Sequence, residues 1–401
     1  MTGDVVVVGG GVIGLASAWR LAERGASVSV VDPEPGGGAS GVAAGMLAPV
    51  TEARIGEGPL LRLNLASWAR WPAFASEVER AAGVSIGYRA DGTLVTAFDA
   101  DDRAALDDLA DRHRAMGLEI TAVRGREVRR LEPGLAPGVR SGFVAAAERS
   151  VDPAALVTAL RASAATAGVR FVAASVERVT TSPAGDRVTG VVLGAGSGPE
   201  PPERIAAGTV VLAAGCWSGR IEGLPAGARP PVRPVKGQIL TLRQPPGERL
   251  VTRTIRGLVH GFSIYLVPRA DGRLVVGATV EERGWDTNVS AGGAYGLLRD
   301  ALALVPGLDD AELVAVRAAL RPGTPDDLPV VGPGAVAGLV VATGHHRNGV
   351  LLTPVTATAV TAAVLGEPVP DEVVACDPRR FAGSADGPAR AAHANVRKVS
   401  A

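Results

Sequence analysis

Four residues near the start of the chain have the types and spacing to bind the phosphates and sugar of a dinucleotide. Glycines stand at positions 9, 11 and 14, and Asp32 follows them. Gly9 would allow a tight turn, Gly11 would let the backbone approach a pyrophosphate, and Gly14 would let a helix pack closely on a strand. Asp32 can accept hydrogen bonds from a ribose 2′-hydroxyl. The competing interpretation is a glycine-rich turn in an ordinary α/β protein.

The segments around these residues are those that such a site requires. The valines from Val5 to Val8 predict a buried strand, and Leu15 to Arg24 predicts a helix with Gly25 just past its end. A second apolar run, 26–31, ends at Asp32. The start of the helix would offer free N–H groups and a partial positive charge to phosphates. Because strand, glycine turn, helix, strand and acid occur in register, dinucleotide binding is favoured.

Composition excludes several other classes of protein. The chain has 401 residues, 47% of them apolar and 20% charged, which is a globular balance. Lys plus Arg and Asp plus Glu number 41 each, so nothing favours nucleic acid as a partner. Two cysteines, Cys216 and Cys376, are too few for a disulfide framework or a zinc site. No apolar run is long enough for membrane insertion, and the apolar start lacks the basic region of a signal peptide, so we expect a cytoplasmic protein.

The order of the predicted elements indicates an α/β fold with two domains. A discontinuous, Rossmann-like cofactor-binding domain would consist of residues 1–85, 151–225 and 325–378. The insertions 86–150 and 226–324 would form an α+β substrate domain with a mainly antiparallel sheet, because strands are predicted at 238–242, 262–268 and 273–278. A small ligand would bind in the cleft between the domains.

Three further expectations concern local structure. Residues 88–98 predict a hairpin around Asp91-Gly92. Thr353-Pro354 marks the first turn of a helix that runs to about Leu365. Residues 379–401 are rich in glycine, alanine and serine and predict a flexible tail.

Other stretches contain residues suited to binding a flat cofactor and a small acid. Small residues fill 39–49, Tyr265 lies in an apolar run, Arg321 precedes a proline, and 344–351 is a loop with two histidines. Each has a structural alternative: the small residues could pack in a core helix, Tyr265 could be core, and Arg321 could pair with Asp326. The adjacent histidines would point apart and have no further ligand cluster, so no metal site is predicted.

Taken together, these stretches resemble the FAD-dependent amine oxidases of the D-amino-acid oxidase type, and among them the glycine oxidases of thiamine biosynthesis. The likeness rests on Ala-Ala-Gly-Met-Leu-Ala-Pro (43–49), Tyr-Leu-Val-Pro-Arg (265–269) with Val-Gly-Ala-Thr (276–279), Leu-Arg-Pro-Gly-Thr-Pro-Asp (320–326) and Gly-His-His-Arg-Asn-Gly-Val-Leu (344–351). These motifs stand in the expected order and spacing, and the likeness extends to about residue 380.

The resemblance implies a site for FAD. The residues that would line it are Gly9, Gly11, Val12, Ile13, Gly14, Asp32, Pro33, Ala39, Ser40, Ala44, Gly45, Met46, Val176, Gly215, His345, His346, Arg347, Asn348, Gly349, Val350 and Leu351. The helix that begins near Thr353 would point its positive end at the pyrimidine edge of the flavin. Relatives with covalent flavin have a cysteine just before the Thr-Pro-Asp segment. Residues 317–323 contain none, so FAD is expected to bind noncovalently.

The resemblance also implies a substrate site. Arg321 would bind the substrate carboxylate with its planar fork, and Tyr265 would add a hydroxyl and an aromatic wall. Arg347 would lie near enough to assist, and Glu52 falls where the family has a carboxylate at the mouth of the site. Val280 stands where a methionine is expected on the pocket wall, so it bears on substrate preference.

The implied reaction is the oxidation of glycine, and of sarcosine or small D-amino acids. A hydride would pass from the α-carbon to the flavin, and the imino acid would give glyoxylate and ammonia or enter thiazole synthesis. Oxygen would be reduced to hydrogen peroxide. Alternatives are a D-amino acid dehydrogenase with a different electron acceptor, a nicotinamide-dependent dehydrogenase, and a non-catalytic flavin-binding regulator. The family also implies a homo-oligomer, specifically a tetramer.

Overall fold

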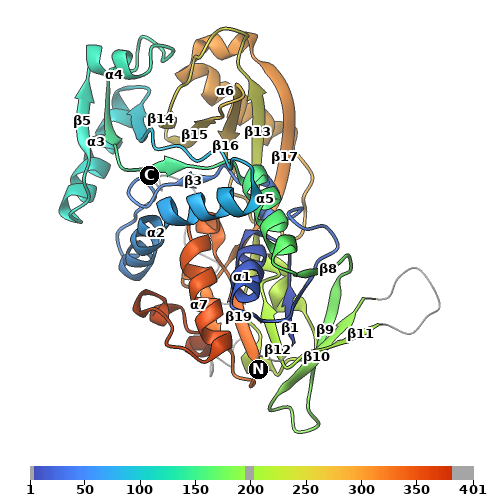
Figure 1. Ribbon diagram of the computed structural model, residues 1–401. Helices are drawn as coiled ribbons and strands as arrows, with labels where there is room; N and C mark the ends of the chain where they lie inside the picture. Colours follow the sequence, from blue (N-terminus) through green and yellow to red (C-terminus); the bar gives the residue numbers. More distant parts are fainter. Residues whose placement is uncertain (1–3, 195–202, 382–401) are drawn as a thin grey trace.

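Two large sheets form the framework of the molecule (Figure 1). The structure is a computed structural model, which describes residues 4–194 and 203–381. Within those ranges, no helix is both long enough and apolar enough to cross a membrane.

A six-stranded sheet draws its strands from three distant parts of the chain. In spatial order they are β18 (Val330–Pro333), β19 (Leu339–Thr343), β12 (Thr209–Leu212), β1 (Val5–Val8), β2 (Val28–Val31) and β8 (Arg170–Val172). All neighbours are parallel except β18 and β19. The four valines of β1 are buried, as expected for a strand covered on both faces of a parallel sheet.

Each face of this sheet has its own cover. Helices α1 (Val12–Glu23), α2 (Gly58–Ala82), α5 (Pro153–Thr166) and α7 (Thr353–Leu365) gather on one face, around the core that contains Val5 and Val7. The antiparallel strands β9 (Val176–Thr181), β10 (Val188–Leu193) and β11 (Arg204–Ala206) cover the other face, where Val6 and Val8 point. The alternation along β1 therefore fills two separate cores.

The second sheet has eight strands. In spatial order they are β17 (Glu312–Gly323), β13 (Arg233–Arg243), β16 (Arg273–Gly277), β15 (Phe262–Pro268), β14 (Thr254–Val259), β4 (Thr93–Ala97), β6 (Ser141–Ala145) and β5 (Thr121–Arg124). Only β14 and β4 are parallel neighbours. Helices α6 (Ala291–Leu304) and α4 (Arg126–Leu131) pack on one face and α3 (Ala100–Ala115) on the other. The predicted α/β fold class with a mainly antiparallel second sheet is confirmed.

Short elements complete the fold. Strands β3 (Met46–Leu47) and β7 (Arg149–Ser150) form a two-stranded sheet. The 3₁₀ helices are η1 (Ala39–Val42), η2 (Gly215–Arg220), η3 (Ala226–Ala228), η4 (Pro306–Asp310), η5 (His346–Asn348), η6 (Asp371–Cys376) and η7 (Pro378–Phe381).

The local expectations had mixed outcomes. The helix from Thr353 to Leu365 is confirmed. The hairpin at 88–98 is wrong: Arg89 bridges to Ser150, and β4 pairs with β6 and β14. Alternation along one strand does not reveal its partners, and here both come from distant segments. Of the predicted tail, residues 379–381 lie in η7, and 382–401 lie outside the described residues. The proposed division into two domains stays a prediction.

Backbone packing explains two of the three glycines in the fingerprint. Gly9 has φ +109° in the turn between β1 and α1, and a Cβ there would overlap the carbonyl of Ala213 on the neighbouring chain segment. A Cβ on Gly14 would overlap the carbonyl oxygen of Gly9. Gly11 instead precedes the first turn of α1 and faces open space apart from the Ser40 hydroxyl. The turn can therefore keep this shape only with glycine at 9 and 14.

We expect Gly14→Ala to lower the free energy of unfolding by about 1–3 kcal/mol, because the new methyl group must push α1 away from the turn. Urea unfolding measures the change. Gly296→Ala is the matched control, since Gly296 lies inside α6 with no atom within 4 Å of a Cβ position. The control should raise the free energy of unfolding by about 0.5–1 kcal/mol through helix propensity. Equal effects of the two substitutions would contradict this account of the turn.

Candidate functional site

One large cavity lies between the two sheets. Its volume is about 1800 Å³, more than the roughly 300–1,000 Å³ of most ligand pockets. Asp32 and Val176 line it from the side of the six-stranded sheet, and Tyr265 and Arg321 line it from the eight-stranded sheet. Of all the predicted cofactor and substrate residues, only Gly14 is absent from its lining. The cavity therefore has room for a dinucleotide together with a small substrate.

The nucleotide side of the cavity has groups suited to phosphate and ribose. Gly11, Val12 and Ile13, at the start of α1, line the cavity, and Gly11 brings no side-chain cap. The Val12 amide donates to the Ser40 hydroxyl at 3.1 Å. Asp32 accepts from the Gly10 amide at 2.6 Å with one carboxylate oxygen and from the Glu34 amide at 2.7 Å with the other. Each oxygen keeps acceptor capacity for a sugar hydroxyl. These residues fit the adenosine and pyrophosphate of FAD.

Packing explains why a glycine stands at position 45 in the segment 44–46. Gly45 has φ +74°, and a Cβ there would overlap the Val151 carbonyl oxygen. The buried Arg269 donates to the carbonyls of Ala44 at 2.7 Å and Val151 at 3.1 Å. This arginine therefore fixes the segment that presents Ala44, Gly45 and Met46 to the cavity.

Arg321 is held in the cavity by neutral acceptors. Its guanidinium donates to the carbonyl of Thr279 at 3.1 Å, with the Lys236 carbonyl at 3.5 Å. It lies flat over Gly237, where any Cβ would overlap it. The alternative pairing with Asp326 is wrong, because Asp326 binds Arg380 at 2.8 Å. No carboxylate of the described residues lies within ion-pair distance of Arg321, so its charge is available to a bound anion.

Tyr265 lies beside Arg321 and, like Arg321, packs over a glycine of a neighbouring strand. Its ring covers Gly277 on β16, where a Cβ would overlap the phenol. Arg321 donates to its hydroxyl. Burial raises the pKa of the Tyr265 phenol, and the nearby Arg321 guanidinium does not offset this. Tyr265 therefore remains a neutral hydroxyl that can donate to a carboxylate.

Glu52 occupies the centre of a charged cluster. It pairs with Arg256, and its carboxylate lies 3.0 Å from Nε of Arg347. Burial pushes the pKa of Glu52 up, but the Arg256 and Arg347 guanidiniums outweigh burial and bring it below its ordinary value. Arg347 also donates to Glu57 at 2.7 Å. Glu52 is thus ionised, and the charge of Arg347 is already balanced.

Val280 lies at the mouth of the cavity. It belongs to the lining, yet 63% of its surface is exposed. Substituents of a substrate that extend towards solvent would pass it.

Sequence reasoning missed three contributors to this site. Arg256 is the partner of Glu52, and Gly237 and Gly277 leave room for the cavity-lining side chains of Arg321 and Tyr265. An isolated arginine within the apolar strand Thr254–Val259 is a signal that could have identified Arg256. For Gly237, the sequence contains no comparable signal, because the clash is with Arg321 from β17.

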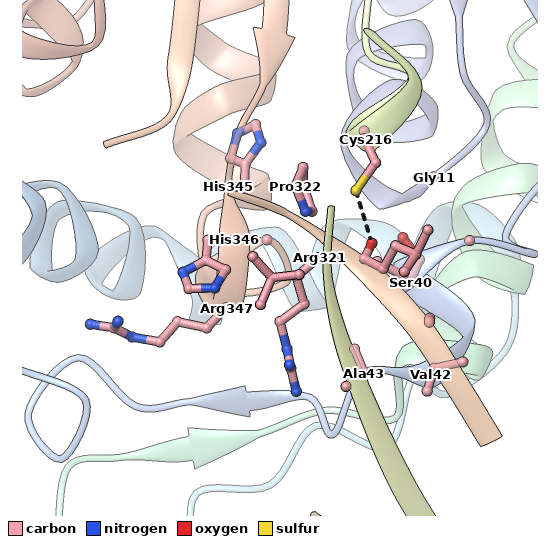
Figure 2. A pocket seen from close by; sticks show the side chains of 18 of the residues that line it. Gly11, Ser40, Val42, Ala43, Cys216, Arg321, Pro322, His345, His346 and Arg347 are labelled. Atoms are coloured by element: carbon pink, nitrogen blue, oxygen red, sulfur yellow. Dashed lines mark hydrogen bonds between the residues drawn. The ribbon is translucent and has the colours of Figure 1, made fainter. Parts of the chain in front are cut away.

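His345 and His346 are both uncharged at neutral pH. Burial lowers the pKa of His345 to about 3, and burial together with Arg321 and Arg347 lowers the pKa of His346 to about 3. His345 Nε2 lies 3.0 Å from the Thr356 hydroxyl in the first turn of α7. Figure 2 shows Arg321, His346 and Arg347 close together. Within the described ranges, no group of three or more His, Cys, Asp or Glu side chains could hold a metal ion.

Cys216 is the one cysteine in the cavity lining of the described chain. Its thiol donates to the Leu320 carbonyl at 3.2 Å, the dashed line in Figure 2. It therefore touches the segment 317–323. Burial raises the pKa of the Cys216 thiol to about 12. A protonated thiol is a poor nucleophile, so this contact does not make Cys216 a flavin attachment point.

Comparisons with known proteins agree with this site. The model of the FAD dependent oxidoreductase family (DAO) matches residues 4–363. The glycine oxidase of Geobacillus kaustophilus is 35% identical over 363 residues, which are 89% of this chain and 91% of that protein. A crystal structure of glycine oxidase from the same organism has a TM-score of 0.83 at 34% identity and covers 94% of this chain and 98% of that one.

A longer relative also matches. The bifunctional protein ThiO/ThiG of Synechocystis sp. is 35% identical over 392 residues, which are 96% of this chain but 55% of that protein. The chain thus spans about half the length of the bifunctional relatives it matches.

We expect acid precipitation of the purified protein to release all of its FAD, because the Cys216 thiol has a pKa of about 12 and is held by the Leu320 carbonyl. Absorbance of the supernatant measures the release. A flavin-bearing peptide that contains Cys216, found by mass spectrometry of the pellet, would contradict noncovalent binding.

A second prediction concerns stability at acid pH. His345 and His346 have folded-state pKa values of about 3, below their ordinary 6.5, so the unfolded state binds more protons between these values. The free energy of unfolding should therefore fall as the pH drops from about 6.5 towards 3, by up to about 1.4 kcal/mol per pH unit for each histidine. Urea unfolding at pH 7.5, 6.5 and 5.5 measures this slope. His345→Gln should reduce it, and an unchanged slope would contradict the role of His345.

Proposed function

We propose that this chain oxidises glycine at the α-carbon. The premise is that it belongs to the FAD dependent oxidoreductase family. The products would be the imino acid, which hydrolyses to glyoxylate and ammonia, and hydrogen peroxide formed from oxygen. The observation that carries the proposal is the Arg321 guanidinium, which shares one cavity with the dinucleotide fingerprint and has no carboxylate partner among the described residues.

FAD would occupy the cavity along the six-stranded sheet. The start of α1 and Ser40 would face its phosphates, and Asp32 would face the ribose. The segments 44–46 and 345–351 would border its flavin ring. When bound, FAD supplies the acceptor for the hydride from the substrate α-carbon and passes the electrons to oxygen.

Arg321 and Tyr265 would bind and orient the substrate. The guanidinium can form two parallel hydrogen bonds with a carboxylate, and the neutral Tyr265 hydroxyl can donate a third. Gly237 lies directly behind Arg321, and Gly277 lies directly behind Tyr265. The positions of both side chains are therefore well defined. Fixing the carboxylate in this way would place the α-carbon for transfer, which is catalysis by orientation.

The charge states of the site favour transfer without a dedicated base. Glu52 is ionised but occupied by Arg256 and Arg347, and the two histidines stay neutral with pKa values of about 3. A neutral substrate amine needs no further deprotonation before the α-carbon is oxidised. The residues of this cavity thus serve to bind and align the substrate.

Finer features of the function are part of the same proposal. Sarcosine and small D-amino acids would be further substrates, because Val280 leaves the mouth open. We also propose noncovalent FAD, a cytoplasmic location and assembly into a homo-oligomer, a tetramer as the family resemblance implies. The imino product would supply thiazole synthesis in thiamine biosynthesis.

The test is peroxide release with glycine and air, compared between the parent and variants at Arg321. Arg321→Ala should lower kcat/KM for glycine roughly 10²- to 10⁴-fold, because an unpaired buried carboxylate costs about 3–5 kcal/mol. Arg321→Lys should be impaired less, since it keeps the charge but loses the fork. The flavin absorption spectrum should be unchanged in both variants.

Arg317→Ala is the matched control, because Arg317 lies exposed on the same strand and outside the cavity lining. An amine without a carboxylate should be oxidised equally by the parent and Arg321→Ala. Equal losses for glycine and this amine, or no peroxide from the parent while another electron acceptor is reduced, would contradict the proposal.

A further inference from the structure

A polar cluster built around two buried side chains lies directly behind the Arg321 side of the cavity. We call it the Gln238 cluster; its members are Lys236, Gln238, Thr279, Glu281, Asp286 and Ser290. The first two belong to β13, and the others belong to the segment 278–290 that connects β16 with α6. Lys236 and Gln238 are 1% and 0% exposed. Burial of these two polar side chains is costly unless each of them is bonded, and the other four members supply their partners.

The two faces of strand β13 have different surroundings. Val235, Gly237 and Ile239 line the cavity, whereas Lys236 and Gln238 alternate with them and lie on the opposite side of the strand. None of the cluster members belongs to the cavity lining. Any effect of the cluster on a bound substrate must therefore pass through the backbone.

Gln238 fastens the segment 278–290 at both ends. Its side-chain amide donates to Glu281 at 2.6 Å and to the Ser290 hydroxyl at 2.9 Å, and its carbonyl accepts from the Ser290 amide at 2.9 Å. Its backbone amide donates to the Thr279 hydroxyl at 2.9 Å, and that hydroxyl donates to Glu281 at 2.6 Å. One glutamine thus bonds both the start and the end of the segment.

Lys236 adds a charge to the same attachment. Its ammonium lies 2.8 Å from Asp286 and 3.9 Å from Glu281. Its backbone exchanges two hydrogen bonds of 2.9 Å with Glu281. The segment 278–290 is therefore held against β13 by backbone, amide and ionic contacts together.

The segment so fixed carries the acceptor that holds Arg321. The Thr279 carbonyl receives the 3.1 Å bond from the guanidinium, and the Lys236 carbonyl lies 3.5 Å from the same nitrogen. Val280, Glu282 and Thr287 of the segment line the cavity. Movement of the segment would therefore displace the anchor of Arg321 and the mouth of the cavity at once.

We propose that Gln238 and Lys236 are positioning residues for substrate recognition, which fix the segment 278–290 so that the Thr279 carbonyl holds Arg321 ready for the substrate carboxylate. The inference rests on the proposed function for the identity of the substrate. Because Arg321 would contact the carboxylate before and during the reaction, weaker positioning should raise KM more than it lowers kcat.

The test uses the holoenzyme and acetate, a carboxylate that cannot be oxidised as an amine. Titration of acetate, followed by the flavin absorption spectrum, gives its Kd, and Arg321→Ala should abolish the spectral change. Gln238→Leu should raise the Kd of acetate and the KM for glycine by about tenfold, the cost of one charge-assisted hydrogen bond, with little change in kcat. Gln244→Leu is the matched control: Gln244 is a buried glutamine just after β13, and among the described residues its side chain bonds only the backbone of Val251.

A second pair of variants tests the proposal even if Gln238→Leu fails to fold. Thr279→Val removes the hydroxyl that links Gln238 and Glu281, and Thr279→Ser keeps it. We expect Thr279→Val to weaken acetate binding and Thr279→Ser to restore it. Parent-like Kd and KM values in Gln238→Leu and Thr279→Val, or equal losses in Gln244→Leu, would overturn the proposal. If the parent makes no peroxide from glycine but the variants still weaken acetate binding, the proposed function fails and the positioning role stands.

Discussion

A guanidinium inside a cavity needs either an anion or enough neutral acceptors to hold it, and among the described residues Arg321 has only neutral acceptors. Oxygens of Lys236, Thr279 and Tyr265 orient it, and Gly237 lets it lie flat on the sheet. Hydrogen bonds of this kind fix direction without cancelling charge. The full positive charge is therefore kept for a ligand, and the surrounding residues must not supply a competing carboxylate.

The neighbouring charges are arranged to meet that condition. Glu52 is a carboxylate of the cavity lining, and it is paired with Arg256 and Arg347. Its loop is held by Glu148, a fully buried side chain that accepts from the amides of Val50 at 3.0 Å and Thr51 at 2.6 Å. Burial raises the pKa of Glu148 despite these bonds. A buried acidic side chain just outside the cavity lining thus holds the backbone of the segment that carries Glu52.

Local patterns sufficed for some parts of this molecule and not for others. The fingerprint around Gly9 and Gly14 and the helix from Thr353 could be predicted, because each is encoded by neighbouring residues whose roles are set by backbone geometry. The pairing of β4 with β14 could not, because strand partners are chosen by packing between distant segments.

The same limit applies within the site. The family resemblance predicted that Tyr265 and Arg321 share one site, and both line the cavity, but the Arg256–Glu52 pair joins residues far apart in the chain. Nor does any local pattern show that Asp326 binds Arg380 instead of Arg321, since that choice depends on where η7 packs. Charges pair by proximity in the folded state, and the sequence lists candidates without their distances.

The hydrogen bond from Cys216 to the Leu320 carbonyl bears on which side chains peroxide would oxidise in such an enzyme. Oxidation of cysteine proceeds through the thiolate, and a buried thiol with a pKa of about 12 is almost wholly protonated at neutral pH. Peroxide released in the cavity would therefore meet an inert sulfur there. Met46 lines the same cavity, half-buried, and a thioether needs no deprotonation to become a sulfoxide. Oxidation by peroxide over many turnovers would therefore occur first at Met46, beside the proposed flavin site, and would spare Cys216.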